Sequence, residues 1–158
     1  MRLLRLGADP NVRSGPGLGT PLGSAVRTCP ELAELLVAAG AEIDARDEEG
    51  ATILHPMANK PHPDAVAWLL AHQADPNARM ADGRTPLHRA AERNGGTRVV
   101  KMLIEAGADP TARDSNDMTA LDYAKERSKS KVATYLSSLR GVRQTPGDST
   151  GDSTGDSI

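Results

Sequence analysis

The sequence contains no phenylalanine and only three aromatic residues, which are Trp68, Tyr123 and Tyr135. Sandwiches and barrels of β-strands normally bury many aromatic and β-branched side chains, so this composition argues against both architectures. Short, closely packed helices can be built from alanine and leucine with few aromatic residues. The composition therefore predicts an all-α protein.

Cysteine and long apolar runs are almost absent as well. Cys29 is the single cysteine, so no disulfide can form within the chain, which fits a reducing compartment. No apolar run approaches the length of about 18 residues that spans a bilayer. The first residues, Met1 to Leu6, also lack the apolar stretch of a signal peptide. We therefore expect an intracellular protein of the cytoplasm or nucleus that does not interact with membranes.

The sequence does contain an internal repeat. Four similar segments begin 33, 33 and 34 residues apart, at Gly7, Gly40, Gln73 and Gly107, and the last three of their five residues resemble Asp-Pro-Asn. A second marker, threonine followed two residues later by leucine, keeps nearly the same step at positions 20, 52, 85 and 119, and arginine recurs at positions 13, 46, 79 and 113. A fixed period of 20–50 residues is typical of stacked repeat architectures.

Each period is predicted to contain two helices and a turn. Thr85 can cap a helix through its hydroxyl group, and Pro86 suits the first helical position because its missing N–H would be unpaired there anyway. A second helix is indicated by the helical spacing of Val99, Val100 and Leu103. Gly107 follows this helix, and glycine in a left-handed conformation ends many helices, so we expect the second helix to end there.

These motifs resemble the ankyrin repeat family, whose mark is a Thr-Pro-Leu-His-x-Ala run at a period of 33 residues. The best match runs from Asp82 to Ala91 and from Val99 to Asp109. The resemblance implies an all-α solenoid of stacked helix-turn-helix units with protruding β-turn or hairpin loops. It also implies that partners bind along a concave groove formed by the turn tips and the first helices.

The expected domain organisation is one ankyrin repeat domain over residues 1–140, followed by a tail. We expect a partial repeat at 1–13 and repeats at 14–46, 47–79, 80–113 and 114–140. Leu3, Leu4 and Leu6 have no preceding repeat to cover them, which leaves open a truncated array or a contact surface. The tail, 141–158, repeats Gly-Asp-Ser-Thr and should be disordered. It is either a spacer or solubilising tail, or a substrate for acidophilic kinases at Ser149 and Ser153.

Two departures from the family pattern predict weak points. Gly23 stands where the family has histidine, next to an irregular Gly-rich turn, so repeat 14–46 should be the loosest. Gln73 stands where the family has a capping glycine, and a left-handed conformation costs a residue with a side chain about 1–2 kcal/mol.

The sequence offers little catalytic chemistry. The resemblance implies a structural role for His55 and His88, which would bond to neighbouring loop backbone. His62 and His72 lie ten residues apart, about 15 Å along a helix, which is too far for one metal ion. Cys29 has no histidine beside it in the sequence. We therefore expect no catalytic residue, no cofactor and no metal, and a protein that is not an enzyme.

Candidate partner contacts follow from the turn tips and the ends of first helices. We expect Glu92 and Arg93 to lie on an exposed helix end, and we expect the acidic repeat 47–79 to adjoin the basic repeat 80–113. Arginines at such sites either form hot spots or merely solubilise the array. The expected contact residues are Glu48, Glu49, Arg79, Ala81, Asp82, Arg84, Arg89, Glu92, Arg93, Ser115, Asn116 and Met118.

On these grounds we expect a monomeric, non-catalytic module, an adaptor or scaffold, that binds a protein or peptide. One alternative is a substrate-recognition subunit of a larger enzyme such as a ubiquitin ligase, and another is a small hydrolase. A nucleic-acid partner is disfavoured because the net charge is −2 and no aromatic platform accompanies the arginines.

Overall fold

The computed structural model describes residues 9–12, 19–60, 62–93 and 96–142. These residues form helices without any strand, which confirms the all-α prediction. The helices come in successive pairs: α2 (Pro21–Thr28) with α3 (Pro30–Ala38), α4 (Leu54–Asn59) with α5 (Pro63–Ala71), α6 (Pro86–Glu92) with α7 (Gly96–Glu105), and α8 (Ala120–Glu126) with α9 (Ser130–Val142).

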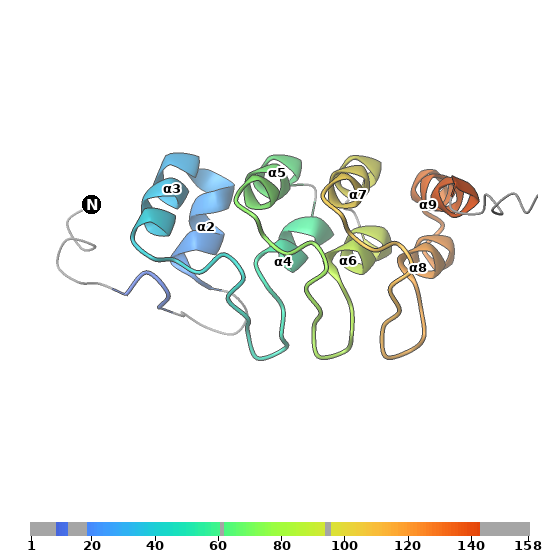
Figure 1. The fold of residues 1–158 in the computed structure, drawn as a ribbon, viewed down its shortest axis with the longest axis horizontal. Helices are drawn as coiled ribbons and strands as arrows, with labels where there is room; N and C mark the ends of the chain where they lie inside the picture. Colours follow the sequence, from blue (N-terminus) through green and yellow to red (C-terminus); the bar gives the residue numbers. More distant parts are fainter. Residues whose placement is uncertain (1–8, 13–18, 61, 94–95, 143–158) are drawn as a thin grey trace, which may run out of the picture.

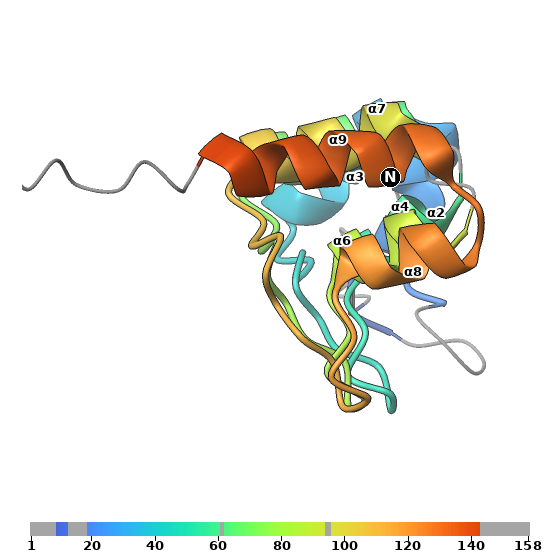
Figure 2. The same cartoon turned by 90° about the vertical axis from the view of Figure 1, so that its right-hand side faces the viewer.

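The pairs stack side by side into two layers (Figures 1 and 2). The second helices α5, α7 and α9 lie against one another in one layer, and the first helices α4, α6 and α8 do so in the other. Long turns project from the first-helix layer, away from the second helices (Figure 2). The core runs continuously between the layers and takes one fully buried leucine from each of α4, α6 and α7, namely Leu54, Leu87 and Leu103.

Two buried histidines tie the first helices α4 and α6 to the turns that follow them. The backbone N–H of Thr85 donates to Nδ1 of His88 at 3.2 Å, so Nε2 carries the hydrogen and donates to the carbonyl of Met118 at 3.0 Å. His55 repeats this arrangement with Thr52 and with the carbonyl of Arg84. The structural role predicted for both histidines is confirmed. Burial lowers the pKa of both imidazoles, which keeps them neutral at pH 7.

The pair α2 and α3 packs differently from the others. A single residue, Cys29, separates these helices, whereas three residues separate the helices of every other pair. α2 lies against α3 and α5, whereas α4 lies against α5 and α6. A cavity of about 300 Å³ remains between α2 and α4, lined in part by Gly23, Arg27 and Lys60. A second cavity of about 330 Å³ lies between α2 and α5. The expectation that this repeat is the loosest stays a prediction, because a pocket of about 380 Å³ also lies between α7 and α9.

Side-chain amides and carboxylates bridge consecutive repeats at the end of each second helix. Asn77 donates from Nδ2 to the carbonyl of Gly107 at 2.9 Å and accepts from the N–H of Asp109 at 2.8 Å. Asn11 bridges Gly40 and Glu42 in the same way. These bonds repeat the period seen in the sequence.

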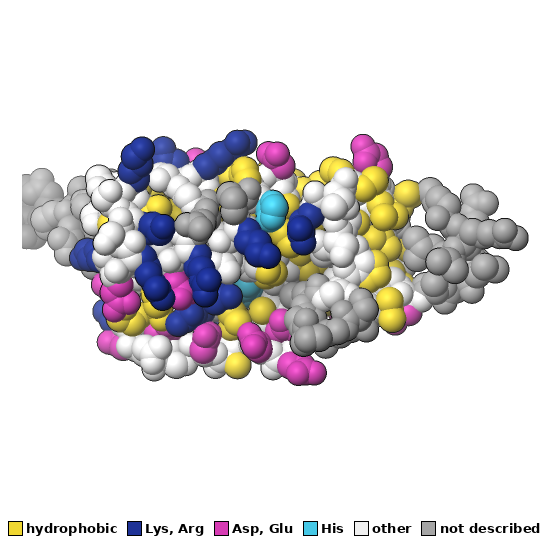
Figure 3. All heavy atoms as spheres, turned by 180° about the vertical axis from the view of Figure 1, so that it is seen from behind, with side chains coloured by type: hydrophobic (Ala, Val, Ile, Leu, Met, Phe, Trp, Pro, Cys, Tyr) yellow, Lys and Arg dark blue, Asp and Glu magenta, His cyan; other side chains and the backbone are white. Residues whose placement is uncertain are grey.

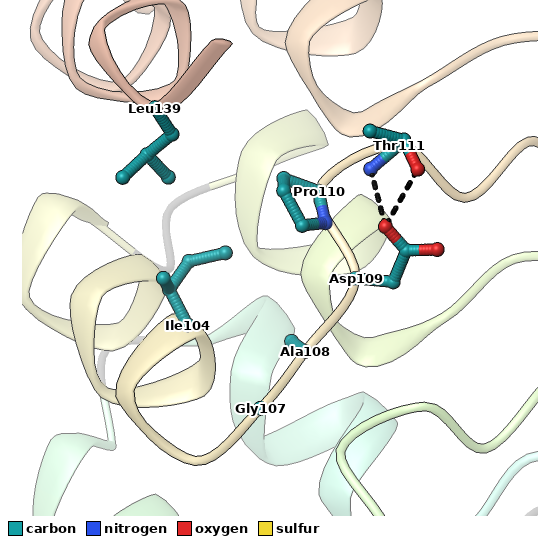
Figure 4. A pocket seen from close by; sticks show the side chains of 7 residues that line it. All are labelled: Ile104, Gly107, Ala108, Asp109, Pro110, Thr111 and Leu139. Atoms are coloured by element: carbon teal, nitrogen blue, oxygen red, sulfur yellow. Dashed lines mark hydrogen bonds between the residues drawn. The ribbon is translucent and has the colours of Figure 1, made fainter. Parts of the chain in front are cut away.

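At the last repeat this series of bridges changes. Thr111 stands in the position of Asn77 and bonds back to Asp109 at 2.7 Å (Figure 4). An apolar pocket of about 380 Å³ lies beside it, with Ile104 and Leu139 facing each other across the opening (Figure 4). α9 continues through Val142, two residues past the expected end of the repeat domain at residue 140. The repeat boundaries remain predictions, and Leu3, Leu4, Leu6 and residues 143–158 lie outside the described part of the chain.

Candidate protein-binding face

The projecting turns are held by aspartate side chains that accept hydrogen bonds from the backbone, and by backbone hydrogen bonds between neighbouring turns. Oδ1 of Asp47 accepts from the N–H groups of Glu49 and Ala51, at 2.9 and 2.8 Å, and Asp114 closes the last turn in the same way. Neighbouring turns are joined as well, because Ala81 N–H donates to the carbonyl of Glu49 at 2.8 Å. The side chains at the tips are therefore left exposed, and they are those of Glu48, Glu49, Ala81, Asp82, Ser115 and Asn116, as the sequence predicts.

Met118 does not lie at a tip. Its side chain is half-buried and packs against the core, and its carbonyl accepts the hydrogen bond from His88. The expectation that Met118 belongs to the exposed tip is wrong, because it is the residue from which the chain enters α8. The exposed tip of this turn therefore contains fewer residues than the sequence pattern suggests.

Arg79 is exposed, but its guanidinium group already has a role in the fold. Nη2 donates to the carbonyl of Arg113 in the next repeat at 2.6 Å. Arg46 makes the same bond to the carbonyl of Arg79. The arginines that recur with the period therefore tie consecutive turns together.

Arg84 points inward, so the expectation that it reaches solvent at the tip is wrong. Only 20% of its side chain is exposed, and Nη1 lies 3.1 Å from Oε2 of Glu92. Its guanidinium group also lies over the ring of Tyr123, 4.9 Å from the centroid, and Nε lies 3.6 Å from Asp114. Burial disfavours the charged form, but Glu92 and the other partners outweigh it and raise the pKa of Arg84. The residue remains charged and serves the contact between α6 and α8.

Glu92 is buried, which corrects the expectation of an exposed helix end. It is 8% exposed, and its carboxylate lies within 3.1 to 3.7 Å of three arginine side chains, Arg84, Arg89 and Arg127. A buried carboxylate needs such partners, because an unpaired buried charge is strongly destabilising. Arg127 comes from the next repeat, 35 residues away, so a pattern within one repeat cannot reveal it.

Asp114 completes this buried cluster. Tyr123 donates its hydroxyl hydrogen to Oδ2 of Asp114 at 2.6 Å. Burial raises the pKa of this carboxyl, but the bonds from Tyr123 and from the backbone of Met118 and Asn116 outweigh burial and leave the pKa below its usual value. The aspartate therefore stays ionised opposite Arg84.

A row of exposed cations follows the other end of the first helices. Lys60, Arg93 and Arg127 are the residues that cap the carboxyl ends of α4, α6 and α8, and we call them the cation row. Positive charge is favourable at this end of a helix because of the helix dipole. Arg27 lies in the last turn of α2, near the position that would extend the row.

Charge on this face differs between the first helices and the turns. In Figure 3, lysine and arginine side chains gather across the middle and along part of the upper edge, and most of the aspartate and glutamate side chains lie toward the lower edge, where the turns are. The expected contrast between an acidic repeat 47–79 and a basic repeat 80–113 stays a prediction, and it does not extend to every position. Lys60 gives the first of these repeats a cation at its helix end, and Asp82 gives the second an acidic tip.

The described residues show no other obvious chemistry. They contain no group of three or more metal-ligating side chains close together. In the same part of the chain, no helix has both the length and the apolar content needed to cross a membrane.

Comparison with known families agrees with this architecture. A family model described as "Ankyrin repeats (3 copies)" matches three overlapping stretches, residues 2–80, 22–114 and 57–146. Among curated proteins, none matches the chain closely enough to count as a relative. The matched stretches together run from residue 2 to residue 146 and so include all of the helices described above.

Proposed function

This chain belongs to the ankyrin repeat family, and we propose that it is a non-catalytic module that binds another protein through the face formed by its turn tips and first helices. Ankyrin repeats are in general protein-protein interaction modules. The partner would lie across several repeats, as a solenoid allows.

The observation that supports this proposal is the set of exposed charged side chains that the fold does not use. Glu48 and Arg93 are exposed and make no ion pair within the described residues. Arg84 and Glu92, in contrast, pair with each other and take part in the contact between α6 and α8. The residues that we propose to contact the partner are therefore those of the turn tips and of the cation row. Arg89, which is half-buried, lies between these two groups.

The structure bears differently on the two alternative functions, a substrate-recognition subunit and a small hydrolase. A substrate-recognition subunit of a larger enzyme would use the same face, and only the identity of the bound complex would distinguish it. The hydrolase alternative gains no support, because His55 and His88 both serve the fold. We therefore propose no activity for the chain by itself.

Charge reversal on the cation row tests the proposal. The chain and its Arg93→Glu variant would be used for affinity capture from native cells, with quantitative mass spectrometry. We expect the partner to be lost by about tenfold or more, as for a residue worth about 1.4 kcal/mol of binding free energy. Lys101→Glu is the matched control, because Lys101 is an exposed cation on α7 in the other layer.

Two outcomes would contradict the proposal. The first is a set of captured proteins that Arg93→Glu leaves unchanged. The second is an equal loss in both variants, which would indicate a response to net charge alone. Arg84 is unsuitable for this test, because its reversal would break the buried contact with Glu92.

A further inference from the structure

The cation row carries positive charge that few carboxylates of the described residues neutralise. Within the described residues, neither Lys60 nor Arg93 forms an ion pair, and Arg127 shares the buried carboxylate of Glu92 with two other arginines. The row is regular, since its members occupy the same position in three consecutive repeats. A ligand for this row would be an extended segment with acidic side chains at a regular spacing.

The chain itself contains such a segment. Residues 147–158 repeat the unit Gly-Asp-Ser-Thr and place an aspartate at every fourth position, at Asp148, Asp152 and Asp156. The segment contains no basic residue. It follows α9 after a link of only a few residues.

We propose that the cation row binds residues 147–158 of the same chain, with Asp148 at Arg127, Asp152 at Arg93 and Asp156 at Lys60. This binding requires no external partner, so it goes beyond the proposed function. A partner that uses the row would compete with the tail.

The length of the chain permits this placement. α9 lies over α8 and runs back from the link between them, so Val142 and Arg127 lie at opposite ends of α9 (Figure 2). A helix of this length, 13 residues, spans about 20 Å. The six residues from Val142 to Asp148 can extend over about 20 Å, and the side chains of Asp148 and Arg127 add to that reach.

The spacing of the aspartates also suits the row. Packed helices lie about 8–10 Å apart, so neighbouring cations of the row should be separated by a similar distance. Four residues of extended chain span up to about 13 Å, which is enough to move from one helix to the next. One aspartate can therefore meet one cation in each of three repeats.

Each ion pair between the tail and the cation row would be weak by itself, but the three pairs together could hold the tail. Exposed ion pairs contribute little on their own and are screened by salt. The covalent connection raises the effective concentration of the tail at the row. We therefore expect an equilibrium that shifts toward release as ionic strength increases.

The native cysteine provides a direct test on the full chain. Cys29 caps the carboxyl end of α2, which borders Lys60, and so lies at the far end of the row from Arg127. With a nitroxide spin label on Cys29, we expect paramagnetic broadening of the tail amides in ¹⁵N spectra. The broadening should be strongest at residues 155–158 and should decrease toward Gly147.

Variants identify the ion pairs as the cause. Replacing Asp148, Asp152 and Asp156 together by asparagine should remove most of the broadening, as should Arg93→Glu. Lys101→Glu should leave it in place. Unchanged helical circular dichroism of the labelled protein would show that the label has not unfolded it.

The proposal is overturned if the tail amides show no broadening in low salt. It is also overturned if the asparagine variant broadens as much as the parent chain, because contact would then not depend on the carboxylates. Either result concerns the tail alone and leaves the capture experiment with Arg93→Glu to decide the proposed function.

Discussion

At the scale of single residues, Gln73 has a left-handed backbone conformation. Glycine occupies the equivalent position in other repeats, and glycine adopts this conformation without strain. The φ of Gln73 is 65°, and Gly40 and Gly107, which end the equivalent helices, have φ values of 93° and 95°. An added Cβ at either glycine would meet no atom within 4 Å. The penalty at Gln73 is therefore conformational and not a steric clash with neighbours, as the sequence predicts.

Gln73→Gly should stabilise the protein. Relief of the left-handed strain, about 1–2 kcal/mol, exceeds the additional entropy that glycine gives the unfolded chain, about 0.4–1 kcal/mol. We expect the free energy of unfolding to rise by about 0.5–1 kcal/mol in chemical denaturation. Gly107→Gln is the reciprocal control and should lower it. A loss of stability in Gln73→Gly would contradict this account.

Residue positions within a repeat could be predicted from the sequence, but the directions of long side chains could not. Thr85 and His88 bond within one turn, so their roles follow from local spacing. Arg84 reaches Glu92 and Asp114, which lie 8 and 30 positions away in the sequence. A side chain that can turn either to solvent or to a buried carboxylate is not placed by periodicity.

At the scale of helices, each second helix buries one stripe and exposes another. On α5, Leu69 is fully buried, with 0% exposure, and belongs to the continuous core. On α3, Leu35 is 38% exposed and Leu32 is similarly open. The helical spacing of apolar residues predicts the buried stripe of α5 correctly, because this helix has a neighbour on both sides.

Leu69→Ala should be far more damaging than Leu35→Ala. Removing a fully buried leucine side chain costs about 2–5 kcal/mol, because it loses buried apolar surface and leaves a cavity. Exposed positions usually change stability by about 0.5 kcal/mol or less, so the half-open Leu35 should lose much less than Leu69. Chemical denaturation of both variants checks the difference. Similar losses would mean that the register of α5 or α3 is not as described.

At the scale of the whole molecule, the pairs of helices differ in how well they are held by their neighbours. α6 lies between α4 and α8 in the first-helix layer, and a cluster of buried charges joins it to α8. α2 borders two cavities and reaches α3 through the single residue Cys29. In a repeat array, stability is approximately the sum of the repeats and of the contacts between neighbours.

Native-state hydrogen exchange should therefore rank the helices. We expect the amides of α2 and α3 to exchange faster than those of α6 and α8, because a pair with weaker contacts opens locally at a lower free energy. The measurement is exchange in the native state, resolved by NMR or mass spectrometry. Equal protection of α2 and α6 would indicate that the array opens only as one unit.

Neighbouring turn tips are joined by main-chain atoms, because Ser115 N–H donates to the carbonyl of Asp82 and Ala81 N–H donates to that of Glu49. Bonds of this kind are indifferent to which side chain each tip carries. Mutation can therefore exchange Glu48, Ala81 or Ser115 for almost any other amino acid while the scaffold persists. Specificity in such a protein is free to drift through evolution, or to be redesigned, at little cost to folding.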